Sequence, residues 1–516
     1  MIRSDRYICA ATLVLILTIA TAAAAQGPGA QGSAAQPQLV PLSGRTAQTG
    51  AVTATQTPVP GPTTGINTLN PAIAVQGPFT GSVAGATRRP FSGTLSLPDA
   101  VLRGLEYNLG AFNLTAIVKQ ARGQRSAARG ALLPNVVGDL TGSRQELNLA
   151  ASGFTSIASP IPGFAFPSVV GPFNTFDLRA RLSQTVFDLT ALNNYRAAGA
   201  TLRADELSVQ DTRDLIVLAV GGAYLQVIAV GARVESAQAQ LETANALYQQ
   251  NAQRRAVGLV AQLDVDRSQV QALTQQQRLI SLQNDFAKQK INLARMVGLP
   301  PTDQYALGDS IPYAAAPAIV LEDALRQARE QRADLKAAAA QVDAAERALS
   351  ATRAQRLPTV QLNADVGAIG PTPADARRTF SITGTVRVPI WAGGRTEAQI
   401  QQAEAALAER RAEMDDLTAQ IEGDLRKAFL DLQAGTTQVD VANRSRQVAG
   451  EALSLTRQRF DAGIIDTVEV IQAQETLANA ELDYINSIFA HNVAKLSLAR
   501  ATGQAAERWP EFLKAP

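Results

Sequence analysis

The chain has 516 residues, of which 46% are hydrophobic and 18% are charged, so it is long enough to build a large core or several domains. Its formal net charge of +2 is not that of a nucleic-acid-binding protein, and we expect no nucleic-acid partner. With one cysteine, Cys9, and one histidine, His491, the composition argues against disulfide frameworks, zinc sites, thiol catalysis and Ser-His-Asp triads. We therefore expect neither an enzyme nor a metal or cofactor site.

Residues 1–25 have the pattern of a secretory signal peptide. Arg3 and Arg6 precede an apolar run, and a run of alanines then offers a small-residue cleavage site before Gln26. The apolar run is too short to cross a bilayer comfortably, which favours a cleaved leader over a membrane anchor. The next stretch, 26–90, is rich in proline, glycine and glutamine. We expect a disordered tether there, because such a segment lacks the apolar surface that would offset its ordering entropy.

Two copies of one structural unit make up the rest of the chain. Gly258 and Gly298 of the first copy recur as Gly463 and Gly503 of the second, at a constant offset. Each copy has the pattern of a helix, a strand, a loop, a strand, a long helix, a turn and a helix. The predicted segments are a first repeat at 91–305, a linker at 306–318, a second repeat at 319–505 and a tail at 506–516.

Each copy contains two amphipathic strands, predicted at 135–147 and 175–187 in the first copy and at 359–369 and 378–390 in the second. In the last of them Phe380 and Ile382 alternate with Ser381 and Thr383, so one face is apolar and the other polar. Strands of roughly 9–11 residues are long enough to cross an outer membrane when tilted. Charged residues of the polar faces are expected to line a water-filled lumen: Asp177, Arg179, Arg181, Asp365 and Arg387.

The long helices follow a heptad pattern. Apolar residues from Ile216 to Tyr248 recur with a four–three spacing, and the second copy repeats this spacing from Ile421 to Leu453. A mean period of about 3.5 residues predicts coiled-coil packing with a left-handed supercoil. A helix over residues 190–256 would extend about 100 Å at a rise of ~1.5 Å per residue.

Four strands cannot close a barrel, and open strand edges are not tolerated in hydrocarbon. Because the smallest closed membrane barrels use about eight strands, the chain must combine with copies of itself. Three copies would give twelve strands, while two or four copies also satisfy this requirement. The alternative is a periplasmic structural coiled-coil tether with no transport role. A tether explains the heptads and the leader, but not two hairpins whose strands match the thickness of a membrane.

The order and spacing of these elements resemble the TolC-like outer-membrane efflux family over about residues 91–505. The resemblance rests on the duplicated unit, on "VPIWAGGR" at 388–395, and on the helix turns "VGLVAQLDV" at 257–265 and "AGIIDTVEVIQAQ" at 462–474. It implies a mainly α fold with a small β part. A duplicated long-helix coiled-coil barrel would continue into four membrane-spanning strands per chain, closed in a homotrimer as a twelve-strand barrel in outer-membrane lipid.

The function that the resemblance implies is that of a passive exit duct, with its helical barrel in the periplasm. A periplasmic adaptor protein and an inner-membrane pump would be its partners, and small molecules or proteins its cargo. The helix turns would form the tips that dock the adaptor, built from Val257, Gly258, Leu259, Gly463 and Ile464. From the residues alone, the two glycines also fit helix C-caps that need a positive φ.

The same resemblance places a periplasmic entrance beside the tips, formed by Asp264, Glu469, Phe460 and Gln472. Three copies would bring several of these carboxylates together around a narrow pore, which would favour cations. Each acid also fits the first turn of a helix, where the helix dipole favours negative charge. The family's gate carries a tyrosine, an arginine and a second aspartate, where this chain has Phe460, Ile465 and Gln472. The polar lock of some family members is therefore partly absent.

Overall fold

The computed structural model describes residues 51–60, 67–83, 91, 93–151, 167–300, 305–309, 313–315 and 319–513. All of them belong to one unit, residues 45–516. The predicted signal peptide lies outside the described residues, as does part of the predicted tether.

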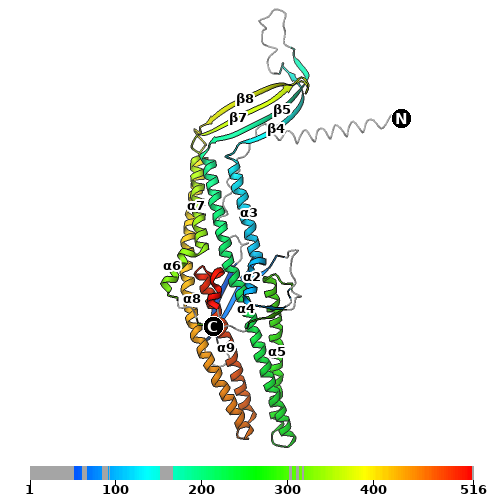
Figure 1. Ribbon diagram of the computed structural model, residues 1–516, viewed down its shortest axis with the longest axis vertical. Coiled ribbons are helices and arrows are strands. Elements are labelled where there is room, and N and C mark those ends of the chain that lie inside the picture. Colours follow the sequence, from blue (N-terminus) through cyan, green and yellow to red (C-terminus); the bar gives the residue numbers. More distant parts are fainter. Residues whose placement is uncertain are drawn as a thin grey trace, which may run out of the picture. The chain divides into compact units, whose positions relative to one another are not determined.

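Helices supply most of the described structure (Figure 1). They are α2 (Leu97–Tyr107), α3 (Leu109–Gly130), α4 (Leu189–Ala256), α5 (Gln262–Met296), α6 (Leu321–Gln331), α7 (Ala333–Ala354), α8 (Arg395–Asp461), α9 (Thr467–Ala501) and α10 (Ala505–Leu513), with a 3-10 helix η1 (Gly77–Thr80). The strands are β1 (Ala51–Pro60), β2 (Asn67–Gln76), β3 (Gly93–Leu95), β4 (Asn135–Asn148), β5 (Val169–Phe187), β6 (Tyr305–Leu307), β7 (Thr359–Gly370) and β8 (Arg377–Arg387).

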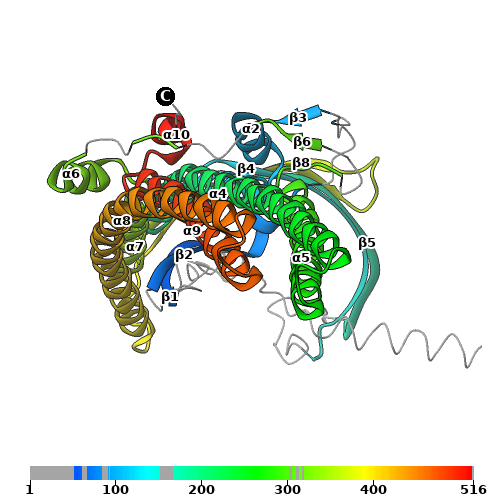
Figure 2. The same cartoon turned by 90° about the horizontal axis from the view of Figure 1, so that it is seen from below.

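The two longest helices form as the heptads predict. Helix α4 has 68 residues and α8 has 67, and Ile421, Leu425 and Ala428 on the heptad face of α8 are at most 4% exposed. Helix α4 packs on α5 and α7, and α8 packs on α9 and α7. Towards the turns, α8, α9, α4 and α5 form a curved layer in that order (Figure 2). The predicted burial of the heptad faces is therefore confirmed.

Strands β4, β5, β7 and β8 form one antiparallel sheet in that order. The sheet lies at one end of the long helices, and the α4–α5 and α8–α9 turns lie at the other (Figure 1). All four predicted strands are confirmed, and two of their boundaries differ from the prediction by more than one residue. Strand β5 begins earlier, at Val169, and β8 ends at Arg387 instead of residue 390. Pro389 explains the early end of β8, because a proline has no N–H to donate to a ladder.

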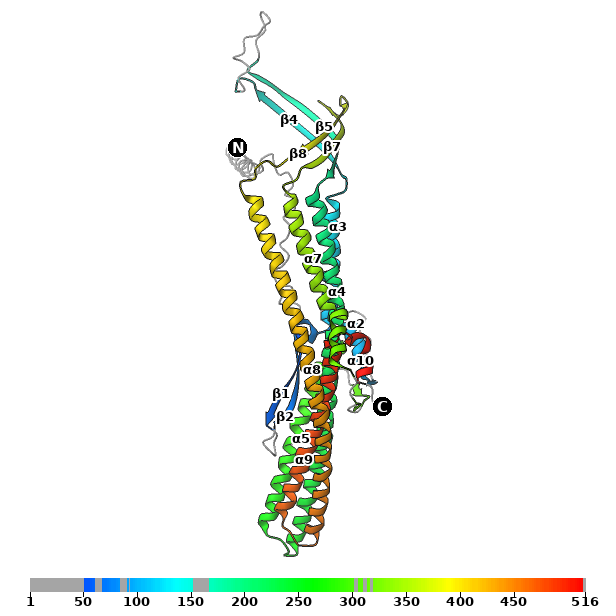
Figure 3. The ribbon, with the colours of Figure 1, turned by 90° about the vertical axis from the view of Figure 1, so that its left-hand side faces the viewer.

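The prediction of a disordered tether over 26–90 is wrong for the part that is described. Strands β1 and β2 pair in antiparallel fashion, with Val52 opposite Val75 and Ala54 opposite Ile73. All four side chains pack on the central core, beside α4 and α9 (Figure 3). The alternation in "AVTATQ" and "PAIAVQ" is a strand signal that the proline- and glycine-rich composition of the surrounding sequence obscures.

The predicted linker and tail also carry regular structure. Strand β6, which begins at Tyr305 and overlaps the start of the predicted linker, pairs in parallel with β3. Most of the tail belongs to α10, which packs on α4 and α9 and buries Phe512 and Leu513.

Helix α4 contains an apolar window long enough to cross a membrane, yet 72% of that window is buried inside the unit. The window therefore belongs to the core, which lies midway along the long helices.

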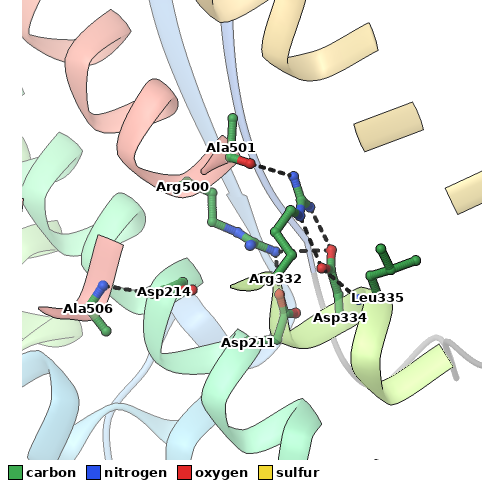
Figure 4. Close-up of polar contacts among 8 residues, drawn as sticks. All are labelled: Asp211, Asp214, Arg332, Asp334, Leu335, Arg500, Ala501 and Ala506. Carbon is green, nitrogen blue, oxygen red and sulfur yellow. Dashed lines mark hydrogen bonds and ion pairs between the residues drawn. The ribbon is translucent and has the colours of Figure 1, made fainter. Parts of the chain in front are cut away.

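A cluster of buried charges joins α4, α7 and α9 within this core (Figure 4). Arg332 donates to both carboxylate oxygens of Asp334, at 3.0 and 2.5 Å. Arg500 forms ion pairs with Asp211 and, at 3.6 Å, with Asp334. Asp214 accepts a hydrogen bond of 2.6 Å from the backbone N–H of Ala506, at the start of α10. The cluster thus fastens the C-terminal helix to the middle of the first repeat.

Two carboxylates of this cluster have pKa values that are shifted in opposite directions. Burial disfavours the charged form of Asp334, but the hydrogen bonds and charge of Arg332 outweigh burial and lower its pKa to about 2. Burial raises the pKa of Asp214 to about 6, against a smaller opposing effect of Arg500. The cluster contains three carboxylates but only two guanidinium groups to pair with them. One carboxylate, that of Asp214, therefore binds a proton more readily than the others.

The first prediction concerns the pH dependence of stability. Because the pKa of Asp214 is raised in the folded protein, folding favours the protonated form, and stability falls as pH rises from about 4 to about 6. The shift corresponds to roughly 3 kcal/mol. In Asp214→Asn the amide oxygen still accepts from Ala506, but no proton is bound. We expect the decline in unfolding free energy between about pH 4 and about pH 7 to be smaller by that amount. Equal slopes for the two proteins, measured by denaturant titration in detergent, would contradict this assignment.

Candidate functional site

One face of the four-stranded sheet is apolar and exposed. Leu140 lies opposite Leu178 across β4 and β5, and Val366 lies opposite Phe380 across β7 and β8. Phe380 is 73% exposed, Ile382 70% and Leu140 68%. A continuous apolar surface of this kind is unfavourable in water and indicates contact with lipid or with another protein surface.

The opposite face carries the predicted charges, and the structure brings most of them together. Arg179 forms ion pairs with Asp365 at 2.7 Å and with Asp177 at 3.3 Å. Arg181 pairs with Asp139 at 3.2 Å. The register places these residues on one side of β4, β5 and β7, because directly opposed residues of antiparallel strands share a face. Sequence reasoning missed Asp139, since the adjacent Val136 and Val137 interrupt the alternation of that strand.

The polar face is also hollowed. A depression of about 340 Å³ is lined by residues of all four strands, including Asn135, Asp139, Arg181, Asn363, Asp365 and Ser381. Ser381 donates to Asp365 at 3.0 Å, which extends the polar network onto β8. Arg387 lies on this same face, at the end of β8, because it is separated from Ser381 by an even number of residues. The predicted lumen charges therefore all lie on the face opposite Leu140 and Phe380, whereas Arg144 and Arg378, near the strand ends farthest from the helices, share the apolar face.

Each long helix ends in the same glycine motif at its tip. Gly258 and Gly463 have φ values of 79° and 74°, in the left-handed region that favours glycine. At the first tip Gly258 N–H donates to Arg255 and Leu259 N–H to Arg254, the two bonds of a Schellman cap. Gly463 and Ile464 repeat both bonds. A Cβ at either glycine would meet no atom within 4 Å, so it is the backbone conformation that requires glycine there.

Both tips present apolar side chains to solvent. Val257 is 70% exposed and Leu259 is 74% exposed beside Gly258, and Ile464 is 66% exposed beside Gly463. The three side chains flank turns whose backbone hydrogen bonds are satisfied locally. Nothing in the turn geometry itself therefore demands apolar residues at these positions, and their exposure suits a surface that another protein covers.

The two tips are tied to each other. The Arg254 guanidinium lies 4.4 Å from the centre of the Phe460 ring and donates to the Phe460 carbonyl at 3.2 Å. Asn251, fully buried, donates to the hydroxyl of Thr467 at 3.3 Å. Phe460 is 4% exposed and packs with Leu247. Its side chain joins the two helical hairpins, so we assign Phe460 to packing and not to an entrance surface.

The predicted entrance acids lie near the tips, each in the first turn of a helix. Asp264 lies in the first turn of α5, with its carboxylate oxygen 3.8 Å from the guanidinium nitrogen of Arg267. Glu469 is exposed in the first turn of α9, and Gln472 is exposed one turn further along. Asp466 caps α9 by accepting from the N–H groups of Val468 and Glu469. Sequence reasoning missed this cap, although an aspartate followed three residues later by a glutamate is its usual signature.

The comparison with known protein families agrees with this geometry. A family profile described as outer membrane efflux protein matches residues 113–299 and 324–504, which lie in the two copies of the repeat. The chain belongs to this family. Members are outer-membrane efflux channels, transporters and not enzymes, with a helical barrel in the periplasm. The predictions of family, of transport and of outer-membrane location are thus confirmed.

Individual relatives are distant but match along most of their length. OpmQ of Pseudomonas putida, a pyoverdine export outer membrane protein, is 25% identical over 417 residues, covering 78% of this chain and 84% of OpmQ. OprJ of Pseudomonas aeruginosa is 25% identical over 463 residues, covering 84% of this chain and 91% of OprJ. Among solved structures, VceC of Vibrio cholerae has a TM-score of 0.68 at 22% identity, covering 80% of this chain and 97% of VceC. The structural likeness supports the fold.

The two faces of β8 allow a matched test of the lipid contact. Ile382 lies on the apolar face and Thr383, the next residue, on the polar face. We expect Ile382→Arg to lower the free energy of unfolding by about 2–4 kcal/mol, because it places a cation in lipid. Thr383→Arg should change it by less than about 1 kcal/mol. Unfolding of both variants in lipid vesicles measures the difference, and equal losses would place the membrane elsewhere.

Proposed function

We propose that this outer membrane efflux protein is a homotrimeric, passive exit duct of a tripartite export system. Small molecules or proteins would enter from an inner-membrane pump and a periplasmic adaptor, and leave through a shared twelve-strand barrel. The observation that carries the proposal is the four-stranded sheet with one lipid-type face, one charged face and two open edges. The energy for transport would come from the pump, and the duct would perform no chemistry.

The open edges argue for closure by further copies. Among the described residues, β4 pairs only with β5, and β8 pairs only with β7. Unpaired backbone groups cost several kcal/mol each in hydrocarbon, so both edges need partners. The simplest partner for β4 is the β8 edge of the next copy. Three copies would then form a barrel of twelve strands with the ion pairs of Arg179 and Arg181 facing its lumen.

The helices favour the same closure. Helices α5 and α8 are the two ends of the curved layer (Figure 2). On α8, Val441, Val448 and Leu455 are at least 60% exposed and recur every seven residues. On α5, Val270 and Ile280 are similarly exposed, at 63% and 59%. Such stripes are the seams through which neighbouring helices pack, so α5 of one copy would meet α8 of the next.

The tips would be the adaptor-docking surface, and the nearby acids the periplasmic entrance. Val257, Leu259 and Ile464 are exposed apolar residues that suit a protein partner. In three copies Asp264 and Glu469 would place carboxylates around one opening, which would favour cations over anions. Gln472 would contribute a neutral polar group to the entrance, one helical turn after Glu469 in α9. The alternative of a periplasmic coiled-coil tether uses the helices but gives no role to the apolar sheet face.

The proposal is tested first by the mass of the protein. We expect the detergent-corrected mass of protein extracted from outer membranes to equal three chains, because both sheet edges need partners and three copies give the proposed twelve-strand barrel. The extracted protein should also form conducting pores in a planar lipid bilayer. A single chain without pores would overturn the duct and favour the tether.

A second test separates docking from folding at the tips. We expect Gly258→Arg, and likewise Gly463→Arg, to leave trimers intact but to abolish export, because a bulky cation would disturb the turn and its docking face. Gly258→Asn is the matched control, since asparagine tolerates a positive φ and adds little bulk. It should retain export. Trimer mass and the resistance of the host to a panel of toxic compounds are the two readouts.

The outcomes of that test differ in meaning. Loss of the trimer in Gly258→Arg would show that the glycine is a folding residue only. Loss of export in both variants would show that the tip turn matters through its backbone geometry. Export by Gly258→Arg at the normal level would remove the tips from the docking surface.

A further inference from the structure

The N-terminal hairpin of β1 and β2 lies on the opposite side of α4 from the elements around β3. On one side Tyr224 of α4 donates to the carbonyl of Leu95 in β3, at 2.8 Å, and a Cβ at Gly104 of α2 would lie 2.7 Å from Val220. On the other side a Cβ at Gly222 would lie 1.8 Å from Ile73 of β2. Val220 and Gly222 point about 200° apart around a helix of 3.6 residues per turn. The hairpin and α2 therefore cover opposite faces of α4.

The side that the hairpin occupies is the concave side of the helical layer. Figure 2 shows β1 and β2 inside the curve formed by α8, α9, α4 and α5, with α2, α6 and α10 outside it. Figure 3 shows the same separation from another direction, with the hairpin on one side of the long helices and α2 and α10 on the other. In a closed assembly the concave side of the layer faces the tunnel, and the convex side faces the periplasm.

The hairpin is firmly attached there. Val52 is 8% exposed, and Ala54, Ile73 and Val75 pack with it on the core. Gln56 donates to the carbonyl of Ala490 in α9, at 2.9 Å. Removing the hairpin would expose the apolar surface of α4 and α9 beneath it to water. The contacts thus indicate a fixed part of the tunnel wall.

The outer face of the hairpin is uncharged. Thr53 lies opposite Ala74 and Thr55 opposite Ala72, and all four side chains are exposed. Gln76 continues this face at the end of β2. These are small or neutral side chains, in contrast to the charged face of the membrane sheet. A solute passing this level would meet hydroxyl, methyl and amide groups.

We propose that strands β1 (Ala51–Pro60) and β2 (Asn67–Gln76) form an internal collar of the tunnel. Three copies of this strand pair, one per chain, line and narrow the tunnel at the level of the buried core and set the width and the neutral character of the passage there. The collar rests on the proposed function, because it requires that three concave faces surround one tunnel. It makes the hairpin a specificity-determining element, since every exported solute must pass it.

The collar is tested by attaching bulk to its exposed face. In a Cys9→Ser background, Thr55→Cys supplies a single thiol on the outer face of the hairpin, and Ala74→Cys supplies one on the neighbouring strand. Arg326→Cys is the matched control, because Arg326 is 69% exposed on α6, on the convex side. Each protein is labelled with a polyethylene-glycol maleimide, and its single-channel conductance is measured in a planar bilayer before and after labelling.

We expect labelling of Thr55→Cys and of Ala74→Cys to remove most of the conductance, while labelled Arg326→Cys conducts as before. Equal conductance of labelled and unlabelled Thr55→Cys and Ala74→Cys pores would overturn the collar and leave the duct intact. Lack of pores in the unmodified protein would overturn the duct, and the collar with it.

A substitution in α4 beneath the hairpin gives an independent test of the collar. Gly222→Leu would place a side chain where Ile73 now lies and would displace β2 from α4. We expect its pores to conduct less than those of the unmodified protein, because β2 would be pushed away from α4 towards the axis of the tunnel. An unchanged conductance in folded Gly222→Leu trimers would argue against the collar.

Discussion

The structure depends on one constraint, which is that a sheet of four strands cannot satisfy its own backbone in lipid. The exposed apolar face that includes Phe380 and Ile382 suits hydrocarbon, and in hydrocarbon the β4 and β8 edges would lack water as a hydrogen-bond partner. In the proposed trimer, other copies would complete the hydrogen bonding of these two edges. The long helices inherit this arrangement, because each strand pair leads directly into the helices that continue the wall towards the periplasm.

Duplication explains why the two halves reach the same geometry with different residues. Gly258 and Gly463 end their helices with the same pair of backbone hydrogen bonds, yet the side chains around them differ. Arg254 from the first half covers Phe460 from the second, so the two hairpins of one chain are joined by an asymmetric contact. The backbone symmetry sets the positions of the tips, and the unequal side chains hold them together.

Much of this fold could be predicted from the sequence, because periodicity and glycine position are local signals. The heptads of α8, the alternation of β8 and the cap glycines each depend on a few neighbouring residues. The buried cluster of Arg332, Asp334 and Arg500 could not be predicted, since its members come from distant segments. The hairpin of β1 and β2 was hidden by a composition typical of disorder. Phe460 was expected at an entrance by resemblance, and packing that no local pattern encodes placed it inside.

Elements near both ends of the described chain, β1 and α10, pack on the central core. Strand β1 reaches α9 through Gln56 and Ala490, which are 434 residues apart in sequence. Helix α10 reaches α4 through Ala506 and Asp214, which are 292 residues apart. Contacts across such separations form late and slowly, because long loops must close first. The apolar middle of α4 therefore remains uncovered until nearly the whole chain has been synthesised and these distant contacts have formed. Until then, the exposed apolar surface of α4 makes the unfinished chain prone to aggregation.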